Sequence, residues 1–131
     1  NAKDAVPFLA FVAEPFDYTN HLTGETVAAA DCDFLSRVLF LGGIHKTYPG
    51  SISCCTAAAA VIPGTVVHEV RGSKTKADIN IGHPGGIVDV SAECQVRDGV
   101  PEITRVCYAR TARRLMDGYC YVPNRCIEEV T

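Results

Sequence analysis

The richest group of chemically useful side chains lies near the middle of the chain. His45 and Lys46 precede Ser51-Ile52-Ser53, and the run of small residues that follows predicts a helix with Ser51 or Ser53 as its N-cap. The first amides of a helix lack intrahelical acceptors, and the helix dipole favours negative charge there. We therefore expect a carboxylate or phosphate to bind at this helix start. Ordinary capping by serine, beside solvated polar side chains, is the alternative.

Three residues are candidates for acid–base chemistry. Cys54 follows the helix start, where the dipole favours a thiolate, although a buried small residue is the plainer interpretation. Lys46 would need burial or a neighbouring cation to act as a base. His83 lies in the run His-Pro-Gly-Gly, whose glycines let the backbone approach a ligand, but the same run also suits a simple turn. The sequence does not decide among these candidates.

Basic residues follow the last long strand pattern. Arg110, Arg113 and Arg114 could pair bidentately with carboxylates. Alternating basic side chains near a strand end also form solvated surfaces, so we rank them below the helix start.

Cysteine and histidine usage argues against a disulfide scaffold and against a metal site. The chain has seven cysteines, an odd number with irregular spacing and no Cys-x-x-Cys pair, which is typical of reduced intracellular thiols. The four histidines lie far apart in sequence, so no zinc-ligand spacing can be assembled. We expect no metal and a cytoplasmic location.

Composition limits the other function classes. With 131 residues, 47% of them hydrophobic, and a net charge of -3, the chain can form one domain with a buried core. This balance excludes a disordered protein and a polybasic nucleic-acid binder. No apolar run approaches the roughly 20 residues that a membrane-spanning helix needs. We expect a soluble protein without nucleic-acid or membrane partners.

The first half of the chain predicts two strands and two helices. Apolar residues predict a strand over 6–13, and turn residues precede a short strand over 25–27. Apolar spacings of three and four predict a helix capped by Asp31 and ended by Gly42-Gly43. The alanine-rich helix that starts near Ser51 ends at Pro63-Gly64. Its small side chains predict close packing on every side, within a sheet wrapped around it.

The second half predicts a mostly antiparallel sheet. Strands are expected over 65–70, 77–81, 88–96 and 119–122. Asp98-Gly99 predicts a hairpin, which places Cys94 opposite Ile103, Val90 opposite Cys107 and Val88 opposite Ala109. That register agrees with the apolar faces except where Arg105 meets Ala92. The fold class is therefore α+β, with one central, unusually small-faced helix.

Four segments together resemble the PrpF-like isomerases. This group contains methylaconitate cis-trans isomerases, methylitaconate delta-isomerases, aconitate isomerases and oxalomesaconate tautomerases. The resemblance runs in order from about Val6 to Pro123. Its segments are Asp33-Phe-Leu-Ser-Arg-Val with His45-Lys46, the run Ala57 to Val67, the run Ile81 to Val88, and the run Arg110 to Pro123.

The resemblance implies a fold and a site. Family members look like two similar lobes of the diaminopimelate-epimerase fold, each a mostly antiparallel curved sheet around a central helix. Residues 1–131 form a single domain that resembles the C-terminal lobe only. In such proteins the substrate lies between the lobes and faces the N-termini of both central helices. The expected substrate-binding residues are His45, Lys46, Ser51, Ile52, Ser53 and His83.

The resemblance also implies a reaction without a cofactor. A proton moves along the allylic system of an unsaturated di- or tricarboxylic acid, and donors and positive charge stabilise the intermediate carbanion. The lysine and cysteine proposed as the acid–base pair resemble residues of an N-terminal lobe, which becomes an expected partner. A homodimer is a further possibility, because a face meant for another lobe should be apolar.

Two departures from the pattern bear on specificity. Residues 48–51 contain no cysteine before the helix, which disfavours two-base epimerisation, and Gly85 replaces the serine of the common Gly-His-Pro-Ser-Gly form. The alternatives are a noncatalytic carboxylate-binding or interaction module, a proteolytic fragment and, last, an amino-acid epimerase or racemase.

Overall fold

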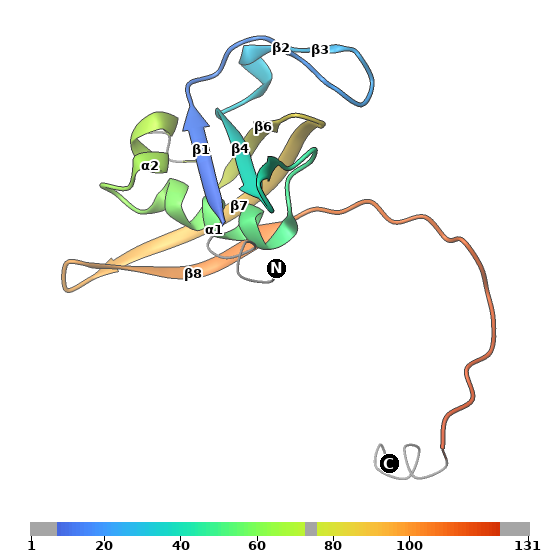
Figure 1. The fold of residues 1–131 in the computed structure, drawn as a ribbon. Helices are drawn as coiled ribbons and strands as arrows, with labels where there is room; N and C mark the ends of the chain where they lie inside the picture. The colour runs from blue at the N-terminus through green and yellow to red at the C-terminus, as the bar shows by residue number, and fades with distance from the viewer. Residues whose placement is uncertain (1–7, 73–75, 124–131) are drawn as a thin grey trace.

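A curved, mostly antiparallel sheet forms the frame of the molecule. The computed structural model describes residues 8–72 and 76–123 (Figure 1). The strand order is β1-β4-β6-β7-β8, with the short β5 paired to β4 and a separate ribbon of β2 and β3; only β4 and β6 run parallel among the described pairings. The strands are β1 (Leu9–Ala13), β2 (Tyr18–Thr19), β3 (Thr26–Val27), β4 (Phe34–Phe40), β5 (Gly43–Ile44), β6 (Asp78–His83), β7 (Gly86–Arg97) and β8 (Val100–Tyr108).

Helix α1 (Gly50–Val61) is the predicted small-faced helix, and it packs on β7 and β8. Its buried residues recur at spacings of three and four and form one stripe: Ser53, Thr56, Ala57 and Ala60. Ser51 and Cys55 on the other side are exposed. Within the described chain, burial on every side is therefore wrong, because the sheet covers one face of the helix. Alanine on that face lets the helix approach the sheet closely.

The predicted helix after Asp31 is wrong, because residues 34–40 form strand β4. Only the 3-10 turn Ala29–Asp31 is helical there. β4 lies between β1 and β6, and Phe34, Leu35, Ser36 and Val38 are all buried. A strand covered on both faces shows a continuous apolar run instead of alternation, so the helical spacing arose by coincidence. Gly42 and Gly43 therefore end no helix: Leu41 and Gly42 adopt φ values of 48° and 77° in the turn after β4, and Gly43 begins β5.

The predicted strand 65–70 is also wrong, because Val66–Arg71 forms the short helix α2. Thr65 accepts a hydrogen bond from the His68 amide at 3.2 Å and so caps the helix. Gly72, with φ of 72°, ends it. A side-chain cap and packing against α1 outweigh the strand preference of three valines.

The β7–β8 hairpin confirms the turn at Asp98-Gly99 and the pairing of Cys94 with Ile103. A β-bulge between Glu93 and Cys94 then shifts the register, so that the predicted partners of Val90 and Val88 are wrong: Tyr108 faces Val90, and the Ala109 amide bonds to the Asp89 carbonyl.

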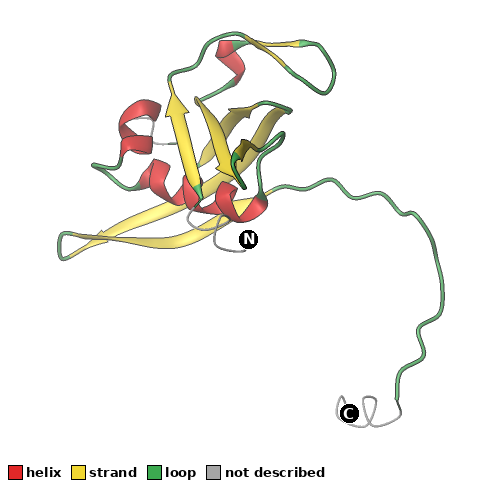
Figure 2. Cartoon of the chain, viewed as in Figure 1, coloured by secondary structure: helices red, strands yellow, loops and turns green. Residues whose placement is uncertain are grey.

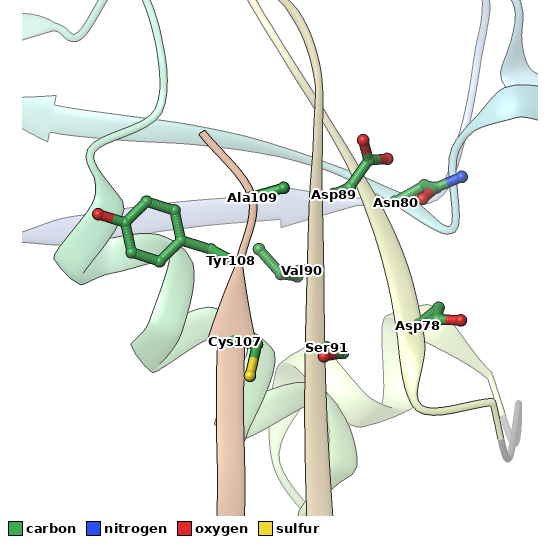
Figure 3. Close-up of a pocket in the computed structure, with 8 residues that line it drawn as sticks. All are labelled: Asp78, Asn80, Asp89, Val90, Ser91, Cys107, Tyr108 and Ala109. Atoms are coloured by element: carbon green, nitrogen blue, oxygen red, sulfur yellow. The ribbon is translucent and has the colours of Figure 1, made fainter. Parts of the chain in front are cut away.

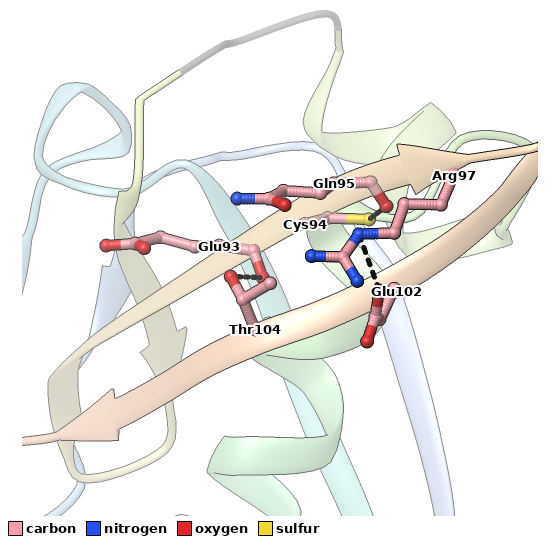
Figure 4. A network of polar contacts seen from close by, with 6 residues as sticks. All are labelled: Glu93, Cys94, Gln95, Arg97, Glu102 and Thr104. Atoms are coloured by element: carbon pink, nitrogen blue, oxygen red, sulfur yellow. Dashed lines mark hydrogen bonds and ion pairs between the residues drawn. The ribbon is translucent and has the colours of Figure 1, made fainter.

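The bulge also removes the predicted mismatch. Ala92 now faces Val106, and Arg105 forms an ion pair of 3.4 Å with Glu93. Figure 4 shows the neighbouring polar contacts of the hairpin, including the Arg97–Glu102 ion pair of 3.2 Å.

The chain after β8 runs away from the sheet as an exposed extended segment (Figure 2). The predicted strand 119–122 is therefore wrong: no described strand pairs with it, and Tyr119 and Tyr121 are almost fully exposed. An isolated strand leaves its backbone groups without partners. The first predicted strand is found as β1 from Leu9, and residues 6 and 7 of it lie outside the described residues.

The described residues contain neither a disulfide nor a membrane-spanning helix. Their cysteines are all free thiols. Neither helix in the described ranges has the length and apolar character to cross a membrane.

Candidate functional site

The start of α1 presents free backbone donors. Pro49 is the N-cap residue, and no side chain caps this end in the described structure. The Ser53 amide makes the first intrahelical bond, to the Pro49 carbonyl at 2.8 Å. The amides of Gly50, Ser51 and Ile52 precede it, which leaves three donors at the positive end of the helix dipole.

The predicted serine cap is wrong, and so is the expected hydroxyl donor at Ser53. The Ser53 hydroxyl donates to the Pro49 carbonyl at 3.0 Å, and the residue is fully buried. Ser51, by contrast, is exposed, and Ile52 is half-buried. The helix can therefore offer an anion its early amides and the Ser51 hydroxyl.

His83 ends β6 and is 7% exposed. Its Nδ1 accepts a hydrogen bond from the Gly85 amide at 3.1 Å. Burial, and after it the neighbouring Arg37, His21 and His45, lower the pKa of His83 to about 4. At neutral pH the ring is therefore uncharged, and because Nδ1 is an acceptor its proton sits on Nε2. His83 thus offers a hydrogen-bond donor at Nε2 and is a poor base.

Tyr48 joins the loop before α1 to the sheet and to the helix. Its hydroxyl lies 2.8 Å from Ser36 Oγ and 2.9 Å from Thr56 Oγ1. Burial raises the pKa of Tyr48, an effect that these hydrogen bonds partly oppose, so the phenol stays neutral. The ring lies next to His83, with 6.1 Å between the centroids. Tyr48 fixes one wall of the site and keeps its phenolic proton at neutral pH.

A cleft of about 390 Å³ opens beside these two rings. Its walls combine the loop that leads into α1, the start of β7 and the chain after β8. They comprise Thr47, Tyr48, His83, Ile87, Val88, Asp89, Ala109, Arg110 and Thr111. The Arg110 guanidinium and the His83 ring give this cleft donors for a carboxylate.

A second cleft of about 420 Å³ lies beside the first and shares Asp89 and Ala109 with it (Figure 3). Asp78, Asn80 and Ser91 contribute polar side chains, and Cys107 and Tyr108 come from β8. Because two carboxylates and no cation line it, it would repel a polycarboxylate. Within the described ranges, no group of three or more metal-ligating side chains is present.

The structure brings only some of the predicted residues together. His83 lines the first cleft, whereas the other predicted site residues are not among those that line it: His45, Lys46, Ser51, Ile52, Ser53 and Cys54. Lys46 is exposed, and its carbonyl approaches Gly85. His45 Nδ1 lies within 3.0–3.1 Å of the carbonyl and amide of Thr47, which shapes the loop.

Sequence reasoning missed Thr47 and Tyr48 and ranked Arg110 low. Tyr48 stands immediately before the Pro-Gly that opens α1, a position that could have marked it. Tyr108 was also missed. Its ring lies next to Gly50, where an added Cβ would be 2.8 Å from the ring. Only the bulge brings Tyr108 to that position, and the sequence pattern did not reveal the bulge.

Comparison with known proteins identifies the family of this chain. The model of the family described as PrpF protein matches residues 1–123. The chain is 43% identical over 119 residues to a 3-methylitaconate isomerase of Eubacterium barkeri, covering 90% of this chain and 30% of that protein. It is 38% identical to a 2-methyl-aconitate isomerase of Cupriavidus necator, covering 92% of this chain and 30% of that protein.

A solved structure gives the same result for the fold. The crystal structure of a methylitaconate-delta-isomerase superposes with a TM-score of 0.74 at 41% identity, covering 95% of this chain and 32% of that one. The frame described above is thus one lobe of a diaminopimelate-epimerase-like α+β fold. The chain spans about 30% of the length of these curated relatives, and it belongs to the PrpF protein family.

Proposed function

We propose that this chain is the C-terminal lobe of a two-lobe isomerase that works without a cofactor. The complete protein would shift a proton allylically in an unsaturated di- or tricarboxylic acid of the aconitate, methylaconitate or methylitaconate type. The names of the relatives support the reaction class. One structural observation carries the assignment to this lobe: neutral His83 presents a buried donor in a cleft whose wall leads directly into the open end of α1.

The lobe's role would be to bind carboxylates and to stabilise negative charge. The amides of Gly50, Ser51 and Ile52, at the helix start next to the cleft lining, can donate to one carboxylate, while His83 Nε2 and Arg110 in the cleft donate to another. When a proton leaves carbon, the charge spreads into the adjacent carboxylate as a dienolate. Fixed donors favour that charge without reorganising, which lowers the barrier.

The acid–base pair would come from the second lobe. His83 binds a proton too weakly to serve as a general base at neutral pH. Lys46 and Cys54 stand outside the cleft lining, and the Ser53 hydroxyl is bonded within the helix. The proposal therefore keeps Ser51, Ile52 and His83 as binding residues, adds Arg110, and leaves His45 and Lys46 as electrostatic neighbours in the loop.

The partners follow from the same proposal. The small polycarboxylic acid and the N-terminal lobe would meet at the open end of α1, and a homodimer would form through apolar side chains exposed when the lobe stands alone. Free thiols in the described chain fit a cytoplasmic location.

The test is a titration of the chain with cis-aconitate, followed by amide and imidazole NMR shifts. We expect shifts at Gly50, Ser51, Ile52 and His83. Replacing Arg110 by Gln should weaken binding about tenfold, as expected for one charged hydrogen bond of about 1.5 kcal/mol.

Arg113→Gln is the matched control, because Arg113 is an exposed arginine of the same segment that does not line the cleft. Equal weakening by both substitutions would show that only net charge matters. In D2O, proton NMR should show no deuterium entering the ligand at carbon; incorporation would place a working base in this chain and contradict the assignment of the base to another lobe.

A further inference from the structure

The hairpin of β2 and β3 (residues 18–27) is bonded to the turn that follows His83. Three successive carbonyls of this turn accept hydrogen bonds from three nearby residues of the hairpin. The donors are His21 (amide and Nδ1, both 2.9 Å) to Pro84, Asn20 Nδ2 (3.2 Å) to Gly85, and the Tyr18 hydroxyl to Gly86. The hairpin lies outside the main sheet (Figure 1), so these bonds fasten it to the site.

Asn20 is the central residue of this connection. It is 9% exposed, although it belongs to a hairpin whose other described residues are mostly exposed. Its side-chain oxygen accepts from the Leu22 amide at 2.9 Å, while its backbone bonds to Glu25 and Gly24 at 2.8 Å each. One residue therefore shapes the hairpin and holds the carbonyl of Gly85. A buried amide with both ends satisfied holds its partners in fixed positions.

Tyr18 reaches across the same turn. An added Cβ at Gly82 would meet the Tyr18 hydroxyl at 3.2 Å, and that hydroxyl donates to the Gly86 carbonyl. The Arg37 guanidinium lies over the Tyr18 ring, 5.1 Å from the ring centroid. Arg37 also donates to the Gly82 carbonyl at 3.1 Å. Of the two glycines that flank the β6–β7 turn, Gly86 is thus held by Tyr18 of the hairpin and Gly82 by Arg37 of β4.

The fastened turn decides which nitrogen of His83 carries the proton. The Gly85 amide donates to Nδ1, and this bond requires the peptide between Pro84 and Gly85 to keep its orientation. The carbonyl of that peptide, on Pro84, accepts both bonds from His21, and the next carbonyl accepts from Asn20. If the turn rotated, Nδ1 would lose its donor and either tautomer of the ring could form.

We propose that the β2–β3 hairpin, through Asn20 and Tyr18, positions His83 by holding the turn that fixes its Nε2–H tautomer. Asn20 and Tyr18 are positioning residues, because they act through the turn and do not line the cleft. The role of this tautomer in carboxylate binding rests on the proposed function. The fixing of the tautomer by the turn is independent of that function.

The experiment compares wild type, Asn20→Asp and Thr23→Ala by long-range proton–nitrogen NMR of the imidazoles. Asn20→Asp keeps the acceptor for Leu22 and removes the donor to Gly85. Thr23→Ala is the matched control, because the Thr23 hydroxyl accepts from the Glu25 amide within the hairpin and has no hydrogen bond to the turn among the described residues. We expect wild type and Thr23→Ala to show the Nε2–H pattern for His83.

For Asn20→Asp we expect a mixture of tautomers and at least about tenfold faster hydrogen exchange of the Gly85 amide. An unchanged His83 pattern in this variant would overturn the proposal. If Asn20→Asp does not fold, Tyr18→Phe removes one hydroxyl with little change of shape and should produce a smaller shift in the same direction; no shift in Tyr18→Phe would then overturn it.

Binding of cis-aconitate is measured in parallel and separates the two proposals. If wild type does not bind the ligand while Asn20→Asp still changes the tautomer, the proposed function fails and the positioning role stands. If wild type binds and Asn20→Asp binds equally well with an unchanged tautomer, the positioning role fails and the proposed function stands.

Discussion

Lowering the pH from 7 to 4 should destabilise the wild-type chain more than its His83→Asn variant. Asn is the chosen replacement because its side-chain oxygen can accept from the Gly85 amide, as Nδ1 does. The folded state keeps His83 neutral because its pKa is lowered to about 4, first by burial and then by Arg37, His21 and His45. The unfolded chain restores the ordinary value of 6.5.

The sign follows from proton binding. Between pH 6.5 and about 4 the unfolded state binds one proton more at His83 than the folded state, so the free energy of unfolding falls as the pH falls. At ~1.36 kcal/mol for each pH unit, the whole window corresponds to about 3 kcal/mol. Above pH 6.5 both states hold the ring neutral, and the two proteins should show the same pH dependence.

Urea unfolding followed by far-UV circular dichroism provides the measurement, since the chain has no tryptophan. The free energies of unfolding of wild type and His83→Asn are measured at pH 7, 5.5 and 4. The change in the gap between the two proteins with pH reports on His83, because the other titrating groups are the same in both. Parallel losses in the two proteins would refute the reasoning. They would mean that His83 is protonated in the folded state without cost and that its ring is not buried as a neutral donor.

Three further substitutions test the packing around the site. Tyr48→Phe removes a buried hydroxyl shared between two hydroxyl partners and should lower the free energy of unfolding by about 1–2 kcal/mol in urea titrations. Ala57→Leu overfills the contact between α1 and the sheet and should cost about 1–3 kcal/mol, measured by thermal unfolding; no loss would mean that the helix can move away freely. Gly50→Ala places a Cβ 2.8 Å from the Tyr108 ring, which is 43% exposed and can swing outward, so NMR should show displaced Tyr108 ring signals with stability changed by less than about 1 kcal/mol. Unchanged ring signals would contradict that contact.

Local patterns identified the parts of the fold that sequence neighbours determine. The alanine-rich helix, the alternating strand β7 and the turn at Asp98-Gly99 were predicted and are confirmed. The two errors of element type arose where tertiary context decides. β4 is covered on both faces and therefore lacks alternation, while α2 depends on the hydroxyl cap of Thr65.

The candidate site was predictable only in part. The helix start and His83 could be named, because amides at a helix end and an imidazole beside glycines have recognisable chemistry. The sequence could not show that the Ser53 hydroxyl bonds back to Pro49, since this depends on the conformation at the first turn. Nor could it place Tyr108 near Gly50, because a one-residue bulge changes which side chain faces the helix.

The parallel pairing of β4 with β6 bears on the order in which the molecule assembles. The strands β6, β7 and β8 follow one another through short turns, so their contacts close small loops and can form early. The pairing of Phe34 with Ile81 closes a long loop that contains both helices. Closing this loop costs chain entropy, which burial of Phe34 offsets only after the pairing has formed. We therefore expect the three-stranded meander to organise first and β4 to join it late.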